Sequence, residues 1–449
     1  MKKISDARLL RGCLLHPMFN NSPQRLGLWK RLQPLFVSII LFNHGALASS
    51  AEGTLSLETA MELTLTQNPQ LRVFDFRDEA LRGQAETAAL KPAIEIGVDV
   101  ENIVGTGNVQ GVDGAELTVS VSSVIELGNK REARMASIGA RRGQLNAEMQ
   151  VDALDLLGEV TRRYIENLAA QNRLSLAQDA ESLARETLQI VQDRASAGAT
   201  PDVEVLRAEA ALSQAELLVS SEENQLRYAQ VALAELWGET NPTFESVTGD
   251  IYQIEESVSF ENLFSRVQQN PFIQIFASEE RMREAEVRLA RTQSTADPRW
   301  SLGARRFQEG GDLGLVAGFS IPLFSATRNR GAVRSAIAAR DEVEVRREVA
   351  LLNLRTQLFN AFQNRQQALI TIDTLQTRTI PLLTEALSET QAAYESGRYS
   401  YLEWVTARQE LIGARSTLID AATAALRHGA DIEQLTAEPL LSPLIDQTN

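Results

Sequence analysis

Four short segments of this chain alternate apolar and polar residues with a period of two. They are residues 94–101, 116–122, 300–305 and 313–321. In the first segment aliphatic side chains fall on one face and Glu95, Asp99 and Glu101 on the other, as expected of a β-strand with two unlike faces. The alternating segments, six to nine residues long, approach the ~9–11 residues that a tilted membrane strand requires, and the apolar-out, polar-in pattern is typical of a transmembrane barrel.

The strands are expected to form two hairpins, 93–126 and 298–323, with helical sequence between them. An ordinary half-exposed antiparallel sheet would show the same alternation, so the pattern alone leaves that alternative open. Four strands cannot close a membrane barrel, because the smallest closed ones have about eight. A barrel would therefore have to combine several copies of the chain.

Two long runs have helical periodicity. Residues 129–197 and 327–396 are rich in Ala, Leu, Glu, Gln and Arg, and Pro381 is their only internal proline. Apolar residues recur at steps of three and four, which is typical of coiled-coil-like faces. A glycine-containing break and a second helical run follow each of them. We therefore expect long helical hairpins over 129–237 and 327–435, with helices on the order of 100 Å at ~1.5 Å per residue.

This order of elements occurs twice. A Gln-Asn-Pro tripeptide at 67–69 recurs at 269–271, and each copy precedes a strand hairpin and a long helical hairpin. We therefore expect two repeats, 49–250 and 251–449, each made of a helix, a strand hairpin and a helical hairpin.

The first 48 residues have the pattern of a secretory signal. An apolar run at 35–42 follows Lys30 and Arg31 and precedes the small-x-small sequence Ala46-Leu47-Ala48, which signal peptidase reads. We expect residues 1–48 to be removed on export. The apolar run is about half of the ~20 residues that a membrane-spanning helix needs.

Composition and charge exclude several classes of function. The net charge of −15 argues against nucleic acid as a partner, because phosphate backbones attract basic proteins. Loss of the signal removes Cys13 and leaves His428 as the single histidine, which excludes a Cys/His metal site or a thiol nucleophile within one chain. We find no nucleophile–base pair or phosphate loop, and we expect no enzyme, no cofactor and no metal site.

Together these features resemble the TolC-type outer-membrane efflux proteins. They are a signal peptide, two repeats, two strand hairpins, and a glycine break after each long helix that is followed by Glu204 or Glu403. The stretch Ile125–Arg131 (IELGNKR) is similar to the IELGGKR signature of the CzcC-like branch, the outer-membrane partners of heavy-metal cation exporters. The resemblance covers about Leu55 to Leu435.

The resemblance implies an α+β fold in which a trimeric outer-membrane β-barrel, with four strands per chain, continues into a long α-helical coiled-coil periplasmic tunnel. Its lipid contacts would be with the outer membrane of a Gram-negative bacterium. The chain would act as the exit duct of a tripartite efflux system, with a periplasmic adaptor protein and a proton-driven inner-membrane RND-type pump. Heavy-metal cations are the expected cargo. A duct for drugs or other organic solutes, and a periplasmic structural coiled-coil protein, are the alternatives.

The resemblance also assigns roles to residues of the helix turns. Acids that ring a closed periplasmic gate would be Asp202, Glu204 and Glu403. The adaptor would dock on the turns, at Gly198, Ala199, Thr200, Val203, Gly397, Arg398, Ser400, Tyr401 and Leu402. Acids at the start of a helix also suit its macrodipole without any gate.

Two further groups of charged residues lie near the strands. Glu95, Asp99 and Glu101 are expected to face the lumen and favour passage of cations. Two basic clusters lie between the end of a predicted strand and the start of a long predicted helix: Lys130, Arg131 and Arg134 in the first repeat, and Arg328, Arg330 and Arg334 in the second. We expect these cations to lie on the helix surface and anchor the membrane interface, in preference to contacting cargo.

Overall fold

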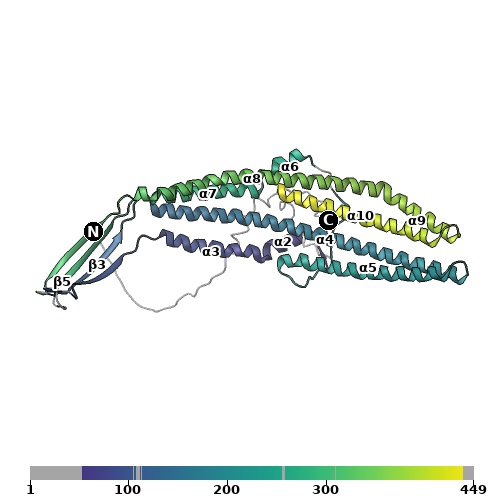
Figure 1. Ribbon diagram of the computed structural model, residues 1–449, viewed down its shortest axis with the longest axis horizontal. Coiled ribbons are helices and arrows are strands. Elements are labelled where there is room, and N and C mark those ends of the chain that lie inside the picture. Colours follow the sequence, from purple (N-terminus) through teal and green to yellow (C-terminus); the bar gives the residue numbers. More distant parts are fainter. Residues whose placement is uncertain are drawn as a thin grey trace, which may run out of the picture. The chain divides into compact units, whose positions relative to one another are not determined.

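The computed structural model describes residues 53–104, 106–107, 112, 114–254, 258–308 and 310–437. The expected signal segment, 1–48, lies outside these residues. Nine α-helices, one 3₁₀ turn, one π-helical turn and six strands follow one another along the described part of the chain (Figure 1). None of the described helices combines the length and the apolarity that crossing a bilayer requires.

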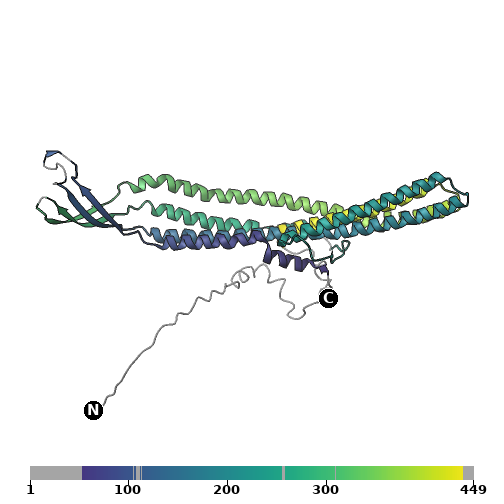
Figure 2. The same ribbon diagram turned by 90° about the horizontal axis from the view of Figure 1, so that it is seen from below.

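Two long helical hairpins dominate the fold. In the first, α4 (Lys130–Ser196) is followed by α5 (Asp202–Ala234). In the second, α9 (Ile380–Glu395) is followed by α10 (Tyr401–Thr436). The hairpins pack side by side through α4 and α10. Both turns lie at the end of the helices that is remote from a four-stranded antiparallel sheet (Figures 1 and 2).

The helix that precedes α9 is interrupted, although its sequence predicts one continuous run. Helix α8 (Ser325–Thr374) passes into a π-helical turn (Leu375–Thr379) before α9 begins. Pro381 lies in the first turn of α9; its ring nitrogen cannot donate to the preceding turn, and π-turns accommodate such a break. The matching stretch of α4 contains no proline and is regular.

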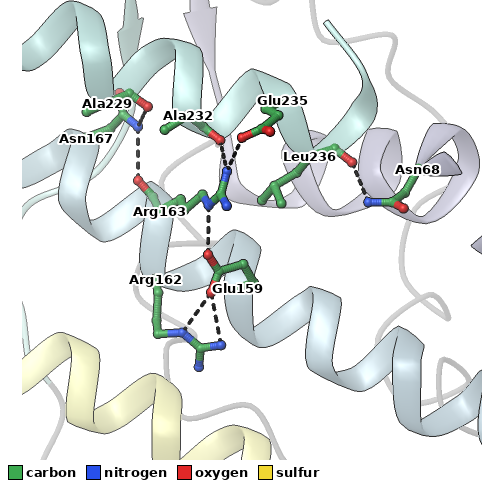
Figure 3. Close-up of polar contacts among 9 residues, drawn as sticks. All are labelled: Asn68, Glu159, Arg162, Arg163, Asn167, Ala229, Ala232, Glu235 and Leu236. Carbon is green, nitrogen blue, oxygen red and sulfur yellow. Dashed lines mark hydrogen bonds and ion pairs between the residues drawn. The ribbon is translucent and has the colours of Figure 1, made fainter. Parts of the chain in front are cut away.

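The Gln-Asn-Pro tripeptides cap helices and join elements. Asn68 lies between α2 (Leu57–Gln67) and α3 (Pro69–Ala89), and its side chain accepts from the Gln70 amide while donating to the Leu236 carbonyl at 2.7 Å (Figure 3). Asn270 lies between α6 (Phe260–Val267) and α7 (Pro271–Thr292). It likewise accepts from the Phe272 amide and donates to two carbonyls at the end of α10. In each repeat the asparagine therefore joins the start of one helix to the last residues of the helical hairpin. A single side-chain amide can do both, because its oxygen caps the helix while its nitrogen donates to a carbonyl.

The main core adjoins Asn68 and includes Leu236, to which Asn68 bonds. Its largest fully buried side chain is Tyr164 of α4, whose hydroxyl lies 3.0 Å from the Leu55 carbonyl and 2.6 Å from the Thr248 carbonyl. These residues adjoin a two-stranded parallel sheet, β1 (Thr54–Leu55) with β4 (Ser246–Val247). On the other face of α4, Asn167 donates to the Ala229 carbonyl and Arg163 to the Ala232 carbonyl (Figure 3), which fixes α5 along α4.

The second sheet is antiparallel, with strand order β2-β3-β5-β6. Its strands are β2 (Glu95–Glu101), β3 (Glu116–Val124), β5 (Arg299–Phe307) and β6 (Leu313–Ser320). The register pairs Val98 with Val119 and then Val119 with Ala304. The predicted apolar residues therefore share one face across the sheet, and most of them are exposed within one chain, Leu315 at 88%.

Candidate functional site

The two hairpin turns have the same backbone geometry. Gly198 and Gly397 take φ values of +70° and +75°, a conformation that glycine adopts without strain. In the first turn the amide of Ala199 bonds to the carbonyl of Arg194, and in the second the amide of Arg398 bonds to that of Ala393, each at 2.8 Å. These are the bonds of a Schellman cap, so the repeat that the glycines indicate extends to the backbone of the turns.

Glu204 connects the first turn to the second hairpin. Its carboxylate accepts from the hydroxyl of Thr200 in its own turn and from the hydroxyl of Tyr394 on α9, at 3.1 Å. The Arg194 side chain makes a parallel connection, because it donates to the Glu395 carbonyl at 2.6 Å and lies 4.8 Å from the Tyr394 ring centre. Together Arg194, Thr200, Glu204 and Tyr394 form what we call the tip tie.

Glu403, the matching acid of the second repeat, has a different surrounding. It forms a capping box with Ser400, in which the Ser400 amide and hydroxyl donate to its carboxylate at 2.7 and 2.9 Å. These bonds hold the pKa of Glu403 below its ordinary value. The third candidate, Asp202, is exposed in the first turn of α5 and has no side-chain partner among the described residues. Of the three acids, Glu204 is the one that links the hairpins.

An aromatic cluster packs against the Tyr394 ring of the tip tie. Tyr394 stacks on Trp404 at 5.0 Å between ring centres and meets Tyr401 edge-on. Burial raises the pKa of the Tyr394 hydroxyl, and the Glu204 carboxylate adds to the shift, so the hydroxyl is a proton donor at neutral pH. Arg408 of α10 is buried nearby and donates to Thr187 of α4 at 2.9 Å; burial lowers its pKa.

The proposed docking residues divide into exposed and inward-facing ones. Val203 and Leu402 expose 52% and 64% of their surface at corresponding places in the two turns. Tyr401 does not, because it is buried against the aromatic cluster, and Ser400 is engaged in the capping box. An apolar docking surface at this end would thus consist of Val203 and Leu402 beside the exposed backbone of the turns.

The polar face of the sheet carries arginines as well as the predicted acids. Arg299 lies 2.6 Å from Glu95, and Arg305 lies 2.6 Å from both Glu101 and Glu116. Asp99 has no ion-pair partner among the described residues and pairs in register with Thr118. Two of the three expected lumen acids are therefore neutralised or shared within the chain, which leaves Asp99 as the acid of β2 that is free to attract a cation.

Lys130 of the first basic cluster is not on the helix surface as expected, whereas Arg131 is. Lys130 is 5% exposed, and its ammonium lies 2.5 Å from Asp297 and 2.8 Å from the Thr295 carbonyl. The other oxygen of Asp297 accepts from the Leu127 amide at 2.9 Å. We call Leu127, Lys130, Thr295 and Asp297 the junction clamp, because it joins the end of β3 to the start of β5. The sequence offered no signal for this pairing, since the partners are far apart along the chain.

The remaining residues of the signature are also structural. Arg134 pairs with Glu126, one nitrogen lying 3.1 Å from the carboxylate. Gly128 has a φ of +75°, and an added Cβ would come within 2.7 Å of the Thr295 hydroxyl, so this position requires glycine. Arg131, Arg328, Arg330 and Arg334 are exposed and have no acidic partner in the described chain.

The described residues contain no group of three or more His, Cys, Asp or Glu side chains placed to hold a metal ion. His428 lies 3.5 Å from a single acid, Asp431. What the arrangement provides is an apolar sheet face, a partly acidic opposite face, and two tied helical turns at the remote end.

These features define the class of protein as an outer-membrane export channel. Residues 60–239 and 267–438 match the model of the outer membrane efflux protein family, and the chain belongs to that family. It is accordingly a protein of the Gram-negative outer membrane and not an enzyme. The α+β fold expected for one chain, with four strands in the larger sheet and long helical hairpins, is confirmed.

The names of individual relatives refer to different substrates. The chain is 27% identical over 365 residues to the cobalt-zinc-cadmium resistance protein CzcC of Cupriavidus metallidurans, covering 81% of this chain and 86% of that protein. It is 26% identical over 323 residues to the pyoverdine export outer membrane protein OpmQ of Pseudomonas putida, covering 65% of each. The open-state MtrE outer membrane channel of Neisseria gonorrhoeae superposes with a TM-score of 0.66 at 16% identity, over 89% of this chain and 94% of that one.

Proposed function

We propose that the chain is the exit duct of a tripartite efflux system that exports heavy-metal cations. In this proposal three copies close a barrel of twelve strands in the outer membrane, and their helices form the tunnel below it. The observation that best supports a duct is the four-stranded sheet. Its apolar face is exposed, and its edge strands β2 and β6 pair on one side only within the described chain. Such a face needs lipid and such edges need further strands.

The helical turns are the proposed point of contact with the other components. Exposed Val203 and Leu402 offer an apolar surface to the hairpin of a periplasmic adaptor, which would join the duct to an inner-membrane RND-type pump. The tip tie is the proposed latch of the closed tunnel. While Tyr394 donates to Glu204, the second hairpin is held against the first.

Metal cations are the proposed cargo because of the likeness to CzcC over most of both chains and because Asp99 leaves unbalanced negative charge on the polar face. The likeness to OpmQ supports the second candidate, a duct for organic solutes. A soluble periplasmic role is disfavoured, because an exposed apolar sheet face of this extent would aggregate in water.

Growth of a deletion strain tests the cargo. We expect sensitivity to zinc, cobalt or cadmium salts, restored by the intact gene, with unchanged tolerance of dyes, detergents and antibiotics. Sensitivity confined to the organic compounds would contradict metal cations as cargo. It would support the second candidate, an outer-membrane duct for organic solutes.

A further inference from the structure

Arg408 is a buried charged side chain that the tip tie does not use. It lies on α10 where that helix contacts α4, and only 7% of its surface is exposed. Its Nη1 donates to the hydroxyl of Thr187 on α4 at 2.9 Å, and no carboxylate of the described chain lies within ion-pair distance of it. A guanidinium carries several N–H donors, so a single hydroxyl satisfies only a small part of this group.

Other cations of the chain show what Arg408 lacks. Lys130 is as deeply buried, but its ammonium pairs with Asp297 at 2.5 Å. Arg415 lies on the same face of α10, about two turns further along. Its guanidinium is 3.9 Å from Asp179 of α4, and its side chain is 38% exposed. Helix α10 therefore presents two arginines to α4, and Arg408 has neither the acid nor the water that Arg415 has.

The burial of Arg408 is unfavourable in the arrangement that the structure describes. A charged group that leaves water without gaining an opposite charge loses solvation free energy. Burial accordingly lowers the pKa of Arg408, although an arginine stays charged at neutral pH. The loss persists only while α4 and α10 enclose the side chain, because separation of the two hairpins would return the guanidinium to water.

We propose that Arg408 favours the open tunnel and so opposes the tip tie. The bond from Tyr394 to Glu204 holds the second hairpin against the first, and the buried guanidinium favours their separation. Two opposing contributions reduce the free-energy difference between the closed and open arrangements, so that a partner with a modest preference for the open one can shift the equilibrium. This inference rests on the proposed latch and adds the residue that favours its release.

Removal of the charge tests the proposal. Arg408→Met retains a long apolar side chain and removes the guanidinium. The full-length protein would be measured in planar bilayers in the Tyr394→Phe background, which lacks the hydroxyl that bonds to Glu204 and is expected to be open more often. There Arg408→Met should lower the open-to-closed ratio on the order of tenfold. Its thermal unfolding should occur at the same temperature as that of the Tyr394→Phe parent or a higher one, because an apolar residue replaces an unpaired buried charge.

A second variant distinguishes this role from that of a simple link between α10 and α4. Thr187→Val leaves the charge of Arg408 in place and removes its one hydrogen-bond acceptor, so it should raise the open-to-closed ratio. If Arg408 only held the helices together, Arg408→Met and Thr187→Val would both raise the ratio. Arg415→Met is the matched control, because it removes a paired and more exposed arginine from the same face of α10, and it should leave the ratio unchanged.

The outcomes separate this role of Arg408 from the latch itself. A lower ratio in Arg408→Met, a higher one in Thr187→Val and no change in Arg415→Met support the proposal. An unchanged or higher ratio in Arg408→Met, a lower unfolding temperature, or an equal decrease in Arg415→Met would overturn it and leave the tip tie as the latch. If Tyr394→Phe alone conducts no more than the wild type, both the latch and the role of Arg408 are wrong.

Discussion

Replacing Lys130 by methionine is expected to lower the free energy of unfolding by about 3 kcal/mol, since removal of one partner from a buried ion pair typically costs about 3–5 kcal/mol. The lower end applies because Asp297 retains its bond from the Leu127 amide and its side chain is 24% exposed. The loss would be measured by urea unfolding of the detergent-solubilised protein, followed by tryptophan fluorescence; Trp300 lies in β5 beside the junction clamp.

The adjacent basic residue provides the control. Arg131 is exposed and has no acidic partner among the described residues, so Arg131→Met removes the same charge next to the same strand end. Its effect is expected to stay within about 0.5 kcal/mol, as for most surface substitutions. Equal losses in the two variants would show that the junction clamp does not stabilise the fold and that Lys130 acts only through its charge.

Removing the hydroxyl of Tyr394 is expected to give the largest functional change. Tyr394→Phe retains the ring that stacks on Trp404 but takes one donor from the Glu204 carboxylate. A hydrogen bond to a charged group contributes about 1.5–3 kcal/mol, which corresponds to a closed-to-open ratio lowered on the order of tenfold to a hundredfold. In planar bilayers the purified variant should show a higher open probability than the wild type.

Two further variants define the tip tie. Tyr399→Phe removes a hydroxyl from an exposed tyrosine of the second turn, whose side chain has no partner in the described chain, and should leave the currents unchanged. Glu403→Gln weakens the capping box but no link between hairpins, so it should also conduct as the wild type does. Unaltered currents in Tyr394→Phe, or equal increases in all three variants, would show that the tip tie does not hold the tunnel closed.

Sequence periodicity predicted the parts of this fold that depend on local pattern. The alternation at 94–101 and 313–321 predicted which residues share a face of the sheet, and the register bears this out. The glycines at 198 and 397 predicted turns, because a positive φ requires that residue type at a Schellman cap.

Contacts between distant segments could not be predicted in this way. Lys130 reads as a surface cation until Asp297 is placed beside it, and Glu204 and Glu403 look equivalent until Tyr394 is found beside Glu204 alone. The π-turn before α9 arises from Pro381, whose effect on a helix varies with its surroundings.

The signature at 125–131 shows the difference between recognising a family and explaining its function. Its residues carry the resemblance to the metal-exporting branch, yet in the structure Glu126 pairs with Arg134, and Gly128 and Lys130 pack at the start of β5. These contacts stabilise the connection between sheet and helices. The signature therefore marks ancestry through structural residues and does not by itself identify the cargo.

The most direct measurement of the proposed function is the metal content of the periplasm. Cells lacking the gene would be loaded with zinc, cobalt or cadmium and their periplasmic fraction released by osmotic shock, beside cells that carry the intact gene. If the chain is the outer-membrane exit for these cations, the deletion should raise periplasmic metal several-fold, and the intact gene should restore it. Equal periplasmic metal in the two strains would contradict export of these cations through this duct.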